Sequence, residues 1–242
     1  MLEAILFDLD GTLLDIDMEY FLSRYFEEMG RMAQLQGIAD AKRLVNQILK
    51  STDIMINDVD TEKHNEEKFM RHFFSHLEVD ERKMREFFDE FYRSGFPRLS
   101  QYCRPFPGIP EMIAGAFKRG FKIVIATNAV FPRTAIQNRL EWAGIGKLPY
   151  SLITSYENMH HCKPFPQYYM EIADRIATPP SACLMVGNDT GEDLAAGEIG
   201  MKTFLVEERL IDRGNSPYSP NWRGSMQDLF SFVDGLNKPG AG

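Results

Sequence analysis

The stretch from Ala4 to Leu14, Ala-Ile-Leu-Phe-Asp-Leu-Asp-Gly-Thr-Leu-Leu, constrains the fold of this chain more than any other. It opens with a short apolar run, and such a run before an abrupt polar turn indicates a buried strand of a parallel sheet. Asp8 and Asp10 follow, and since alternate residues of a strand face one side, their carboxylates begin together. Gly11 then permits a turn. A cation between two buried like charges would remove their repulsion, and carboxylate oxygens suit Mg²⁺.

The charge balance of the chain excludes several kinds of partner. Its 242 residues include 27 Lys plus Arg and 35 Asp plus Glu, which gives a net charge of −8. An acidic chain without a basic run is a poor ligand for nucleic acid or for an anionic membrane. No apolar run approaches the roughly 20 residues of a membrane span, and the acidic N-terminal stretch is unlike a signal peptide. Three widely spaced cysteines favour reduced thiols, and we expect a cytoplasmic protein.

The segment that follows Leu14 changes character and carries apolar residues at helical spacing, without a strand signal, as far as the prolines that begin at Pro97. Its aromatic stripes are typical of a bundle core. A polar, Asp-rich loop is expected over 52–64. Helices are predicted at four places: 16–36, 44–49, 66–76 and 80–94, with Asp80 as an N-cap. The segment therefore predicts a small helical bundle inserted after the first strand.

Beyond the proline-rich return, helices and strands alternate. Strands are expected at 122–126, 150–154, 183–186 and 203–206. Helices are expected at 108–118, 133–143, 166–176, 192–200 and 226–236. This alternation predicts an α/β fold with a doubly wound parallel sheet, in which ligands bind beyond the carboxyl ends of the strands. We predict two domains: an α/β core of residues 1–15 and 100–242, and a helical domain of residues 16–99.

Three further motifs fall at predicted strand ends. Thr127 and Asn128 follow the strand 122–126, where a hydroxyl and free amides can bind the oxygens of an anion. Lys163, followed by a proline, lies just before a predicted helix. The fourth motif, Gly-Asn-Asp-Thr-Gly-Glu-Asp over 187–193, runs from a strand into a helix N-terminus. The motifs should therefore meet at one edge of the sheet.

Taken together, the four motifs resemble those of the haloacid dehalogenase-like (HAD) superfamily. The first matches its Asp-x-Asp-Gly-Thr pattern, and Thr127 and Lys163 with its proline match the second and third motifs. The resemblance extends over nearly the whole chain. It implies a Rossmann-like core with an inserted helical cap of the C1 type, and the activity of a phosphatase.

The resemblance also implies a mechanism. Asp8 would attack phosphorus and form an aspartyl-phosphate, and Asp10 would protonate the leaving alcohol and then accept a proton from water. Mg²⁺ would be held by Asp8, the main-chain carbonyl of Asp10 and a residue of the fourth motif. The phosphoryl oxygens would be held by four residues and their amides: Leu9, Thr127, Asn128 and Lys163.

The fourth motif departs from the usual pattern, because Asn188 stands where most relatives have the first Asp, and Asp189 follows it. Either residue could supply the metal ligand. Mg²⁺ prefers carboxylates, which favours Asp189. Asp193 would accept a hydrogen bond from a metal-bound water or from Lys163.

Three other functions remain open. A 2-haloacid dehalogenase also uses an Asp nucleophile but needs neither a metal nor an acid two residues on, so Asp10 argues against it and Asn188 mildly favours it. A phosphomutase of the beta-phosphoglucomutase type shares the core and cap. A non-catalytic binding protein could use the same fold, although the intact set of motifs weighs against that. Small-molecule phosphate esters are the expected partners, and the sequence does not identify one.

Overall fold

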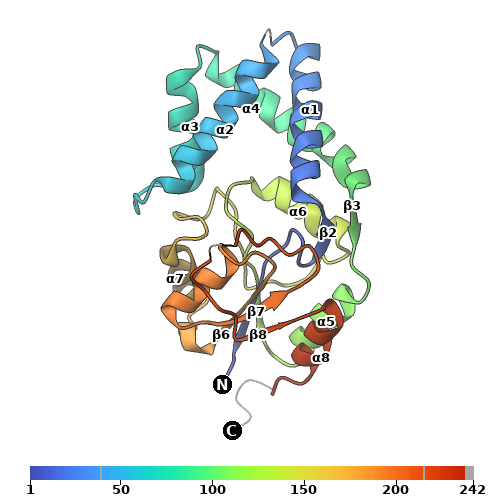
Figure 1. Cartoon of the computed structure of the whole chain (residues 1–242). Helices are drawn as coiled ribbons and strands as arrows, with labels where there is room; N and C mark the ends of the chain where they lie inside the picture. The colour runs from blue at the N-terminus through green and yellow to red at the C-terminus, as the bar shows by residue number, and fades with distance from the viewer. Residues whose placement is uncertain (39, 215, 238–242) are drawn as a thin grey trace.

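The structure, a computed structural model, describes residues 1–38, 40–214 and 216–237. Four helices stand above an α/β layer, and both described ends of the chain lie at the bottom of that layer (Figure 1). The arrangement confirms the predicted fold class, a parallel sheet flanked by helices with a helical insertion after the first strand. The division of the chain at residues 15/16 and 99/100 stays a prediction.

A six-stranded parallel sheet forms the core, in the order β5-β4-β1-β6-β7-β8. The central strand β1 (Ala4–Phe7) is fully buried and pairs with β4 (Lys122–Ile125) and β6 (Cys183–Gly187). Phe7 lies opposite Ile125 and Val186 in this register. The residues that follow these three strands therefore emerge side by side at one edge of the sheet. The outer strands are β5 (Leu152–Ile153), β7 (Lys202–Val206) and β8 (Trp222–Gly224).

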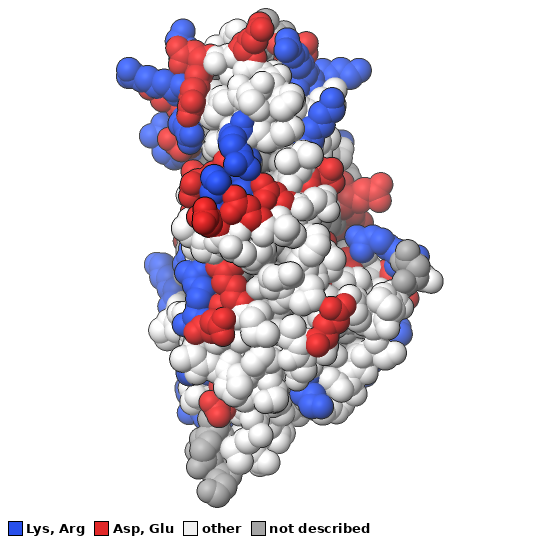
Figure 2. Space-filling model, turned by 90° about the vertical axis from the view of Figure 1, so that its left-hand side faces the viewer, with Lys and Arg blue, Asp and Glu red and all other residues white. Residues whose placement is uncertain are grey.

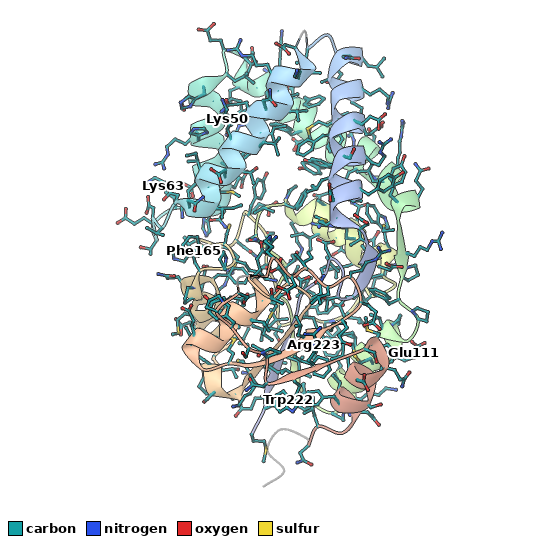
Figure 3. The ribbon with its side chains drawn as sticks, viewed as in Figure 1. Lys50, Lys63, Glu111, Phe165, Trp222 and Arg223 are labelled. Atoms are coloured by element: carbon teal, nitrogen blue, oxygen red, sulfur yellow. The ribbon has the colours of Figure 1, made fainter. Side chains whose placement is uncertain are left out.

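Strand β8 is absent from the sequence prediction. It has three residues, of which Trp222 and Arg223 are exposed, and such a short, wet edge strand leaves little alternation to detect. Figure 3 shows these two side chains in the lower part of the molecule, away from the four upper helices.

Successive residues of β1 face opposite layers, as the pleat requires. Ile5 and Phe7 pack in one apolar cluster with residues of α5 (Ile109–Lys118), α6 (Arg133–Trp142) and α8 (Met226–Asp234). Ala4 and Leu6 pack in the other with α7 (Pro166–Arg175). The sheet is thus covered on both faces. The segment predicted as a helix over 192–200 is a 3-10 helix, Asp193–Ile199, longer than most helices of this type.

The upper helices are α1 (Met18–Leu35), α2 (Ala41–Asn57), α3 (Asn65–His76) and α4 (Glu81–Glu90). The carboxylate of Asp80 accepts a hydrogen bond from the amide of Lys83, so it caps α4 as predicted. The loop predicted over 52–64 is wrong in its first half, because Met55 continues the buried face of α2. The helix predicted over 80–94 ends as an α-helix at Glu90, and one π-helical segment follows, Phe91–Gly95, then a 3-10 segment, Phe96–Tyr102.

Hydrogen bonds connect the helical part to the core at two places, among other contacts. The first is a pair of antiparallel strands that the sequence did not reveal, β2 (Leu14–Ile16) and β3 (Cys103–Pro105), at the start and end of the insertion. The second is the N-terminal turn of α3, where Lys68 Nζ donates to the carbonyl of His160 at 2.6 Å and Asn65 Nδ2 to that of His161 at 3.2 Å. The insertion is thus held at its two ends by β2 and β3 and near its middle by α3.

Charged groups are interspersed on the surface. On the face shown in Figure 2, positive and negative side chains alternate over the helical part, and most of the core below is uncharged. Within the described residues, no helix has the length and the apolar character that crossing a bilayer requires.

Candidate active site

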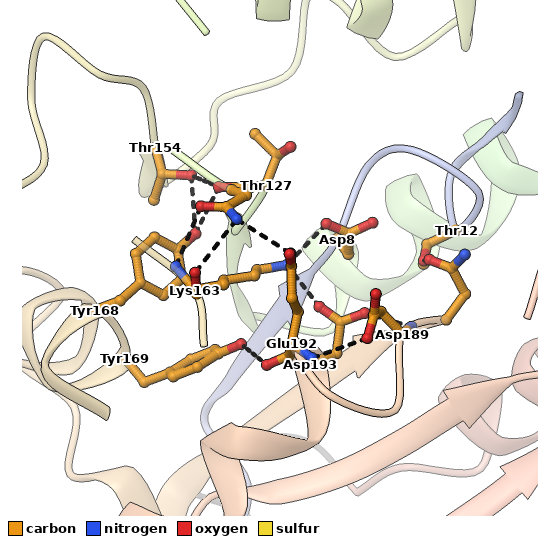
Figure 4. Close-up of polar contacts among 12 residues, drawn as sticks. Asp8, Thr12, Thr127, Thr154, Lys163, Tyr168, Tyr169, Asp189, Glu192 and Asp193 are labelled. Carbon is orange, nitrogen blue, oxygen red and sulfur yellow. Dashed lines mark hydrogen bonds and ion pairs between the residues drawn. The ribbon is translucent and has the colours of Figure 1, made fainter. Parts of the chain in front are cut away.

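An ammonium group shared between two carboxylates lies at the centre of the strand-end cluster (Figure 4). Lys163 Nζ is 2.8 Å from Asp8 Oδ1 and 2.6 Å from Asp193 Oδ1. The side chain of Lys163 is 1% exposed, and that of Asp8 is 12% exposed. Gly187 allows this arrangement, because a Cβ there would collide with the carboxylate of Asp193. The first, third and fourth motifs therefore meet as predicted.

The electrostatics of the cluster leave it short of positive charge. Burial raises the pKa of Asp8 more than Lys163 lowers it, and burial raises the pKa of Asp193 to about 6. Burial also raises the pKa of Glu192 to about 7. Although burial lowers the pKa of Lys163, Asp193 and Asp8 outweigh it and hold that pKa well above its usual value. Desolvated carboxylates that outnumber their cations are the setting in which a further cation is favourable.

Asp10 has a different cationic partner, which the sequence analysis did not identify. Its Oδ2 forms an ion pair with Nη1 of Arg139, a side chain that is completely buried. The guanidinium carbon of Arg139 lies 4.4 Å from the ring centroid of Phe131. Burial raises the pKa of Asp10, and Arg139 opposes that rise. The other carboxylate oxygen, Oδ1, is buried and has no hydrogen-bond partner among the described residues.

The second motif is held in place by hydrogen bonds to the carbonyl of Thr127 and to the side chain of Asn128. The carbonyl of Thr127 accepts hydrogen bonds from Thr154 Oγ1 and from the Tyr168 hydroxyl, both at 2.7 Å. The side chain of Asn128 accepts from the amide of Lys163 at 3.2 Å and donates to the carboxylate of Glu192 at 3.2 Å. The hydroxyl of Thr127 is not used in these bonds, which leaves it available to a ligand.

The turn after β1 is also well ordered by its own chain. The carbonyl of Leu9 accepts from the amides of Leu13 and Leu14, both at 2.9 Å, and Gly11 takes a φ of +83° that favours glycine. Leu9 is completely buried. The turn thus holds Asp8 and Asp10 at the same strand end.

Both candidate metal ligands of the fourth motif have partners of their own. Asn188 Oδ1 accepts from the Thr12 hydroxyl at 3.0 Å, and its Nδ2 donates to the Arg209 carbonyl at 2.6 Å. Asp189 Oδ1 accepts from the amides of Gly191 and Glu192, at 2.7 and 2.9 Å. Asp189 Oδ2 is 2.9 Å from Nη1 of Arg213, whose side chain is 62% exposed.

The residues present fit Mg²⁺. Within residues 1–38, 40–214 and 216–237, no three His, Cys, Asp or Glu side chains form a ready-made metal cluster. Mg²⁺ needs no such cluster, since it is usually held by one or two carboxylates and keeps several waters. Asp8 and a carboxylate such as Asp189, together with a main-chain carbonyl, make up a donor set of that kind. The side-chain partner of Asp189 Oδ2 is an exposed arginine that can turn to solvent, whereas the side-chain amide of Asn188 is bonded through both its oxygen and its nitrogen.

Arg139 and Glu192 are the site residues that the sequence analysis missed. Arg139 lies three and four residues beyond Ile136 and Ala135, which are both buried, so a cation on the apolar stripe of its helix was a usable signal. Glu192 stands beside Asp193 without any feature of spacing or context that marks it.

Known proteins with similar sequences cover most of the chain. It is 26% identical over 232 residues to "Protein SUPPRESSOR OF QUENCHING 1, chloroplastic" of Arabidopsis thaliana. This match covers 88% of the present chain but only 19% of that protein. It is 22% identical over 240 residues to "Pyrophosphatase PpaX" of Bacillus cereus. This match covers 98% of the present chain and 99% of that protein.

Solved structures show the same fold. A HAD phosphatase from Thermococcus onnurineus matches with a TM-score of 0.60 and 18% identity, over 98% of this chain and 100% of that one. An L-2-haloacid dehalogenase from Xanthobacter autotrophicus matches with a TM-score of 0.56 and 14% identity, over 98% of this chain and 100% of that one. A family model described as a haloacid dehalogenase-like hydrolase matches residues 2–199. The motifs lie together at one edge of the sheet, and the chain belongs to the haloacid dehalogenase-like hydrolases.

Proposed function

We propose that this hydrolase is a Mg²⁺-dependent phosphatase that cleaves a small phosphomonoester through an aspartyl-phosphate on Asp8. The contact that carries the proposal is the one between Asp8 and Lys163, 2.8 Å apart, with Asp10 two residues on at the same edge. A carboxylate oxygen of Asp8 attacks phosphorus, and the bond from phosphorus to the leaving oxygen breaks. Asp10 gives its proton to the departing alkoxide and accepts one from the water that cleaves the acyl phosphate.

The remaining groups bind the phosphoryl oxygens. Lys163 supplies a positive charge, and the hydroxyl of Thr127 and the amides next to Leu9 and Asn128, after β1 and β4, donate hydrogen bonds. Mg²⁺ would be held by Asp8, the main-chain carbonyl of Asp10 and Asp189, with Asn188 as the alternative to Asp189. When bound, the metal offsets the repulsion between the carboxylate and the phosphate.

The comparisons favour a phosphatase over the other three candidate functions. The PpaX relative, matched along nearly its whole length, is named a pyrophosphatase. A 2-haloacid dehalogenase shares the fold, but its reaction needs no acid two residues after the nucleophile, where this chain has Asp10. A phosphomutase would use the same core, and a non-catalytic protein would have no need to keep two desolvated carboxylates against one lysine.

The setting of the reaction follows from the surface and the cysteines. We place the enzyme in the cytoplasm, since Cys103, Cys162 and Cys183 are all free thiols. Small phosphate esters are its proposed partners, rather than nucleic acid or a membrane, because the chain carries a net charge of −8. Residues 16–99 form the proposed cap above the site.

Phosphate release from acetyl phosphate, with Mg²⁺ and with EDTA, tests the proposal. Acetate is a small leaving group that needs no acid, so its release does not require Asp10 as a proton donor. We expect Mg²⁺-dependent turnover, and a phosphorylated Asp8 peptide in acid-quenched samples analysed by mass spectrometry. Turnover that ignores EDTA, or no turnover at any Mg²⁺ concentration, would contradict the proposal.

A further inference from the structure

A cavity of about 200 Å³ lies between the upper helices and the loop that follows β4. It is lined mainly by residues of α1 to α4 above and by Val130, Phe131, Pro132 and Tyr156 below. Most of its lining is aromatic or aliphatic, and none of the lining residues is Asp, Glu, Lys, Arg or His. Two nearby lysines do not belong to the lining: Lys50 of α2 is exposed, and Lys63, in the loop before α3, pairs with Asp60 at 3.0 Å (Figure 3).

The cavity lies close to Asp10, the proposed proton donor. Phe131 forms part of its wall, and the same ring packs against the guanidinium of Arg139, which pairs with Asp10. Phe131 also lies only three residues beyond Asn128, which contacts the main chain of Lys163. The Phe131 ring therefore separates the cavity from Arg139, the partner of the residue that would protonate the leaving group.

We propose that this cavity holds the organic part of the substrate, and that this part is uncharged, largely apolar and about the size of one aromatic ring. The inference rests on the proposed phosphatase function and adds the class of ester. A cavity of about 150 Å³ lined by apolar side chains holds benzene. A charged leaving group would be desolvated there without a counter-charge, which is costly.

The hydroxyls of the lining allow one polar group on the ligand. Tyr25 and Tyr92 satisfy each other, with 2.8 Å between their hydroxyl oxygens. The hydroxyl of Tyr156, a third lining residue, makes no hydrogen bond to the residues that the structure describes. A hydroxyl or carbonyl on an otherwise apolar leaving group would find a partner there.

The first test compares alkyl esters that place similar demands on the proton donor: benzyl phosphate, glycerol 3-phosphate and phosphoglycolate. We expect kcat/KM for benzyl phosphate to exceed both others by about 100-fold, since single methylene groups in apolar pockets already give 10-fold or more. Equal or lower values for benzyl phosphate overturn the inference. Acetyl phosphate separates the two proposals, because turnover of it without a benzyl preference overturns this inference alone, and failure to hydrolyse it overturns the phosphatase function itself.

The second test places a charge at the cavity wall. Leu49, which lines the cavity, and Ile54, which does not, lie on the same helix and are 49% and 47% exposed. We expect Leu49→Lys to lower kcat/KM for benzyl phosphate by about 10-fold and to leave acetyl phosphate unchanged. The matched control Ile54→Lys should change neither, and thermal melts of both variants check their folding. Equal effects of Leu49→Lys on the two substrates, or none on either, overturn the inference.

Discussion

The strand-end site is lined by charged and polar side chains, whereas the cavity above it is lined mostly by apolar ones. Around Asp8 the side chains are ionised or hydrogen-bonded, buried, and tied to one another by contacts of 2.6 to 2.8 Å. The cavity a short distance away is lined by aromatic and aliphatic groups without a formal charge. The first region offers a fixed electrostatic environment for a phosphoryl group, and the second offers only shape and desolvation.

This contrast separates the chemical step from the choice of substrate. In the proposed mechanism every phosphate ester uses Asp8, Lys163 and the metal, so a change there should affect all substrates alike. A change in the cavity affects only esters whose leaving group enters it. Asp10 and Arg139 lie between the two regions, because one faces the reaction and the other packs against the cavity wall through Phe131.

The largest effect is expected for Asp8→Asn, because an amide is a far poorer nucleophile than a carboxylate. Turnover should fall at least about 10⁴-fold on acetyl phosphate and benzyl phosphate alike, as it does when other enzymes lose a nucleophile. Steady-state rates on both substrates, with mass spectrometry to exclude deamidation, measure it. A loss confined to one substrate would break the separation between chemistry and selection.

A smaller effect that depends on the leaving group is expected for Asp10→Asn. General acid catalysis contributes about 10²–10⁴-fold, and poor leaving groups need it most. Benzyl phosphate should therefore lose much more activity than 4-nitrophenyl phosphate, whose leaving group needs little protonation. Equal losses in kcat on the two substrates would assign Asp10 a structural role only.

Arg139→Met tests the link between the regions through stability. The change leaves the buried carboxylate of Asp10 without its partner, so unfolding in urea should show a loss of about 3–5 kcal/mol. Adding Asp10→Asn to this variant should restore part of that loss, because no buried charge is then left unpaired. A single variant as stable as the wild type would show that the ion pair contributes nothing to the fold.

The smallest of these effects concerns the metal. If Asp189 is the ligand, Asp189→Asn should raise the Mg²⁺ concentration for half activity by about 10–100-fold, and Asn188→Ala should change it less. The reverse order would identify Asn188 as the ligand, and Asn188→Asp should then tighten the metal. The titration is made with acetyl phosphate, so that the cavity does not influence the result.

Much of the site was predictable because its signals are local. A short apolar run before a polar turn marks a parallel strand, and the polar residues after such strands share one edge of the sheet. Asp8, Thr127 and Lys163 are all found in that position. The predictions were weaker where local pattern was short or absent, as in β8 and in the extension of α2 to Asn57.

Local patterns in the sequence predicted the alternation of strands and helices in the core, the family and the strand-end motifs, because each is carried by a few consecutive residues, whereas β2, β3 and β8 were too short to be detected. Which charged side chains form ion pairs depends on the tertiary structure. Asp10 and Arg139 are 129 positions apart, and their pairing depends on how α6 packs against the turn after β1. The cavity likewise exists only where four helices and one loop converge. Burial and charge neutralisation are properties of the packed molecule, so no single stretch of chain carries them.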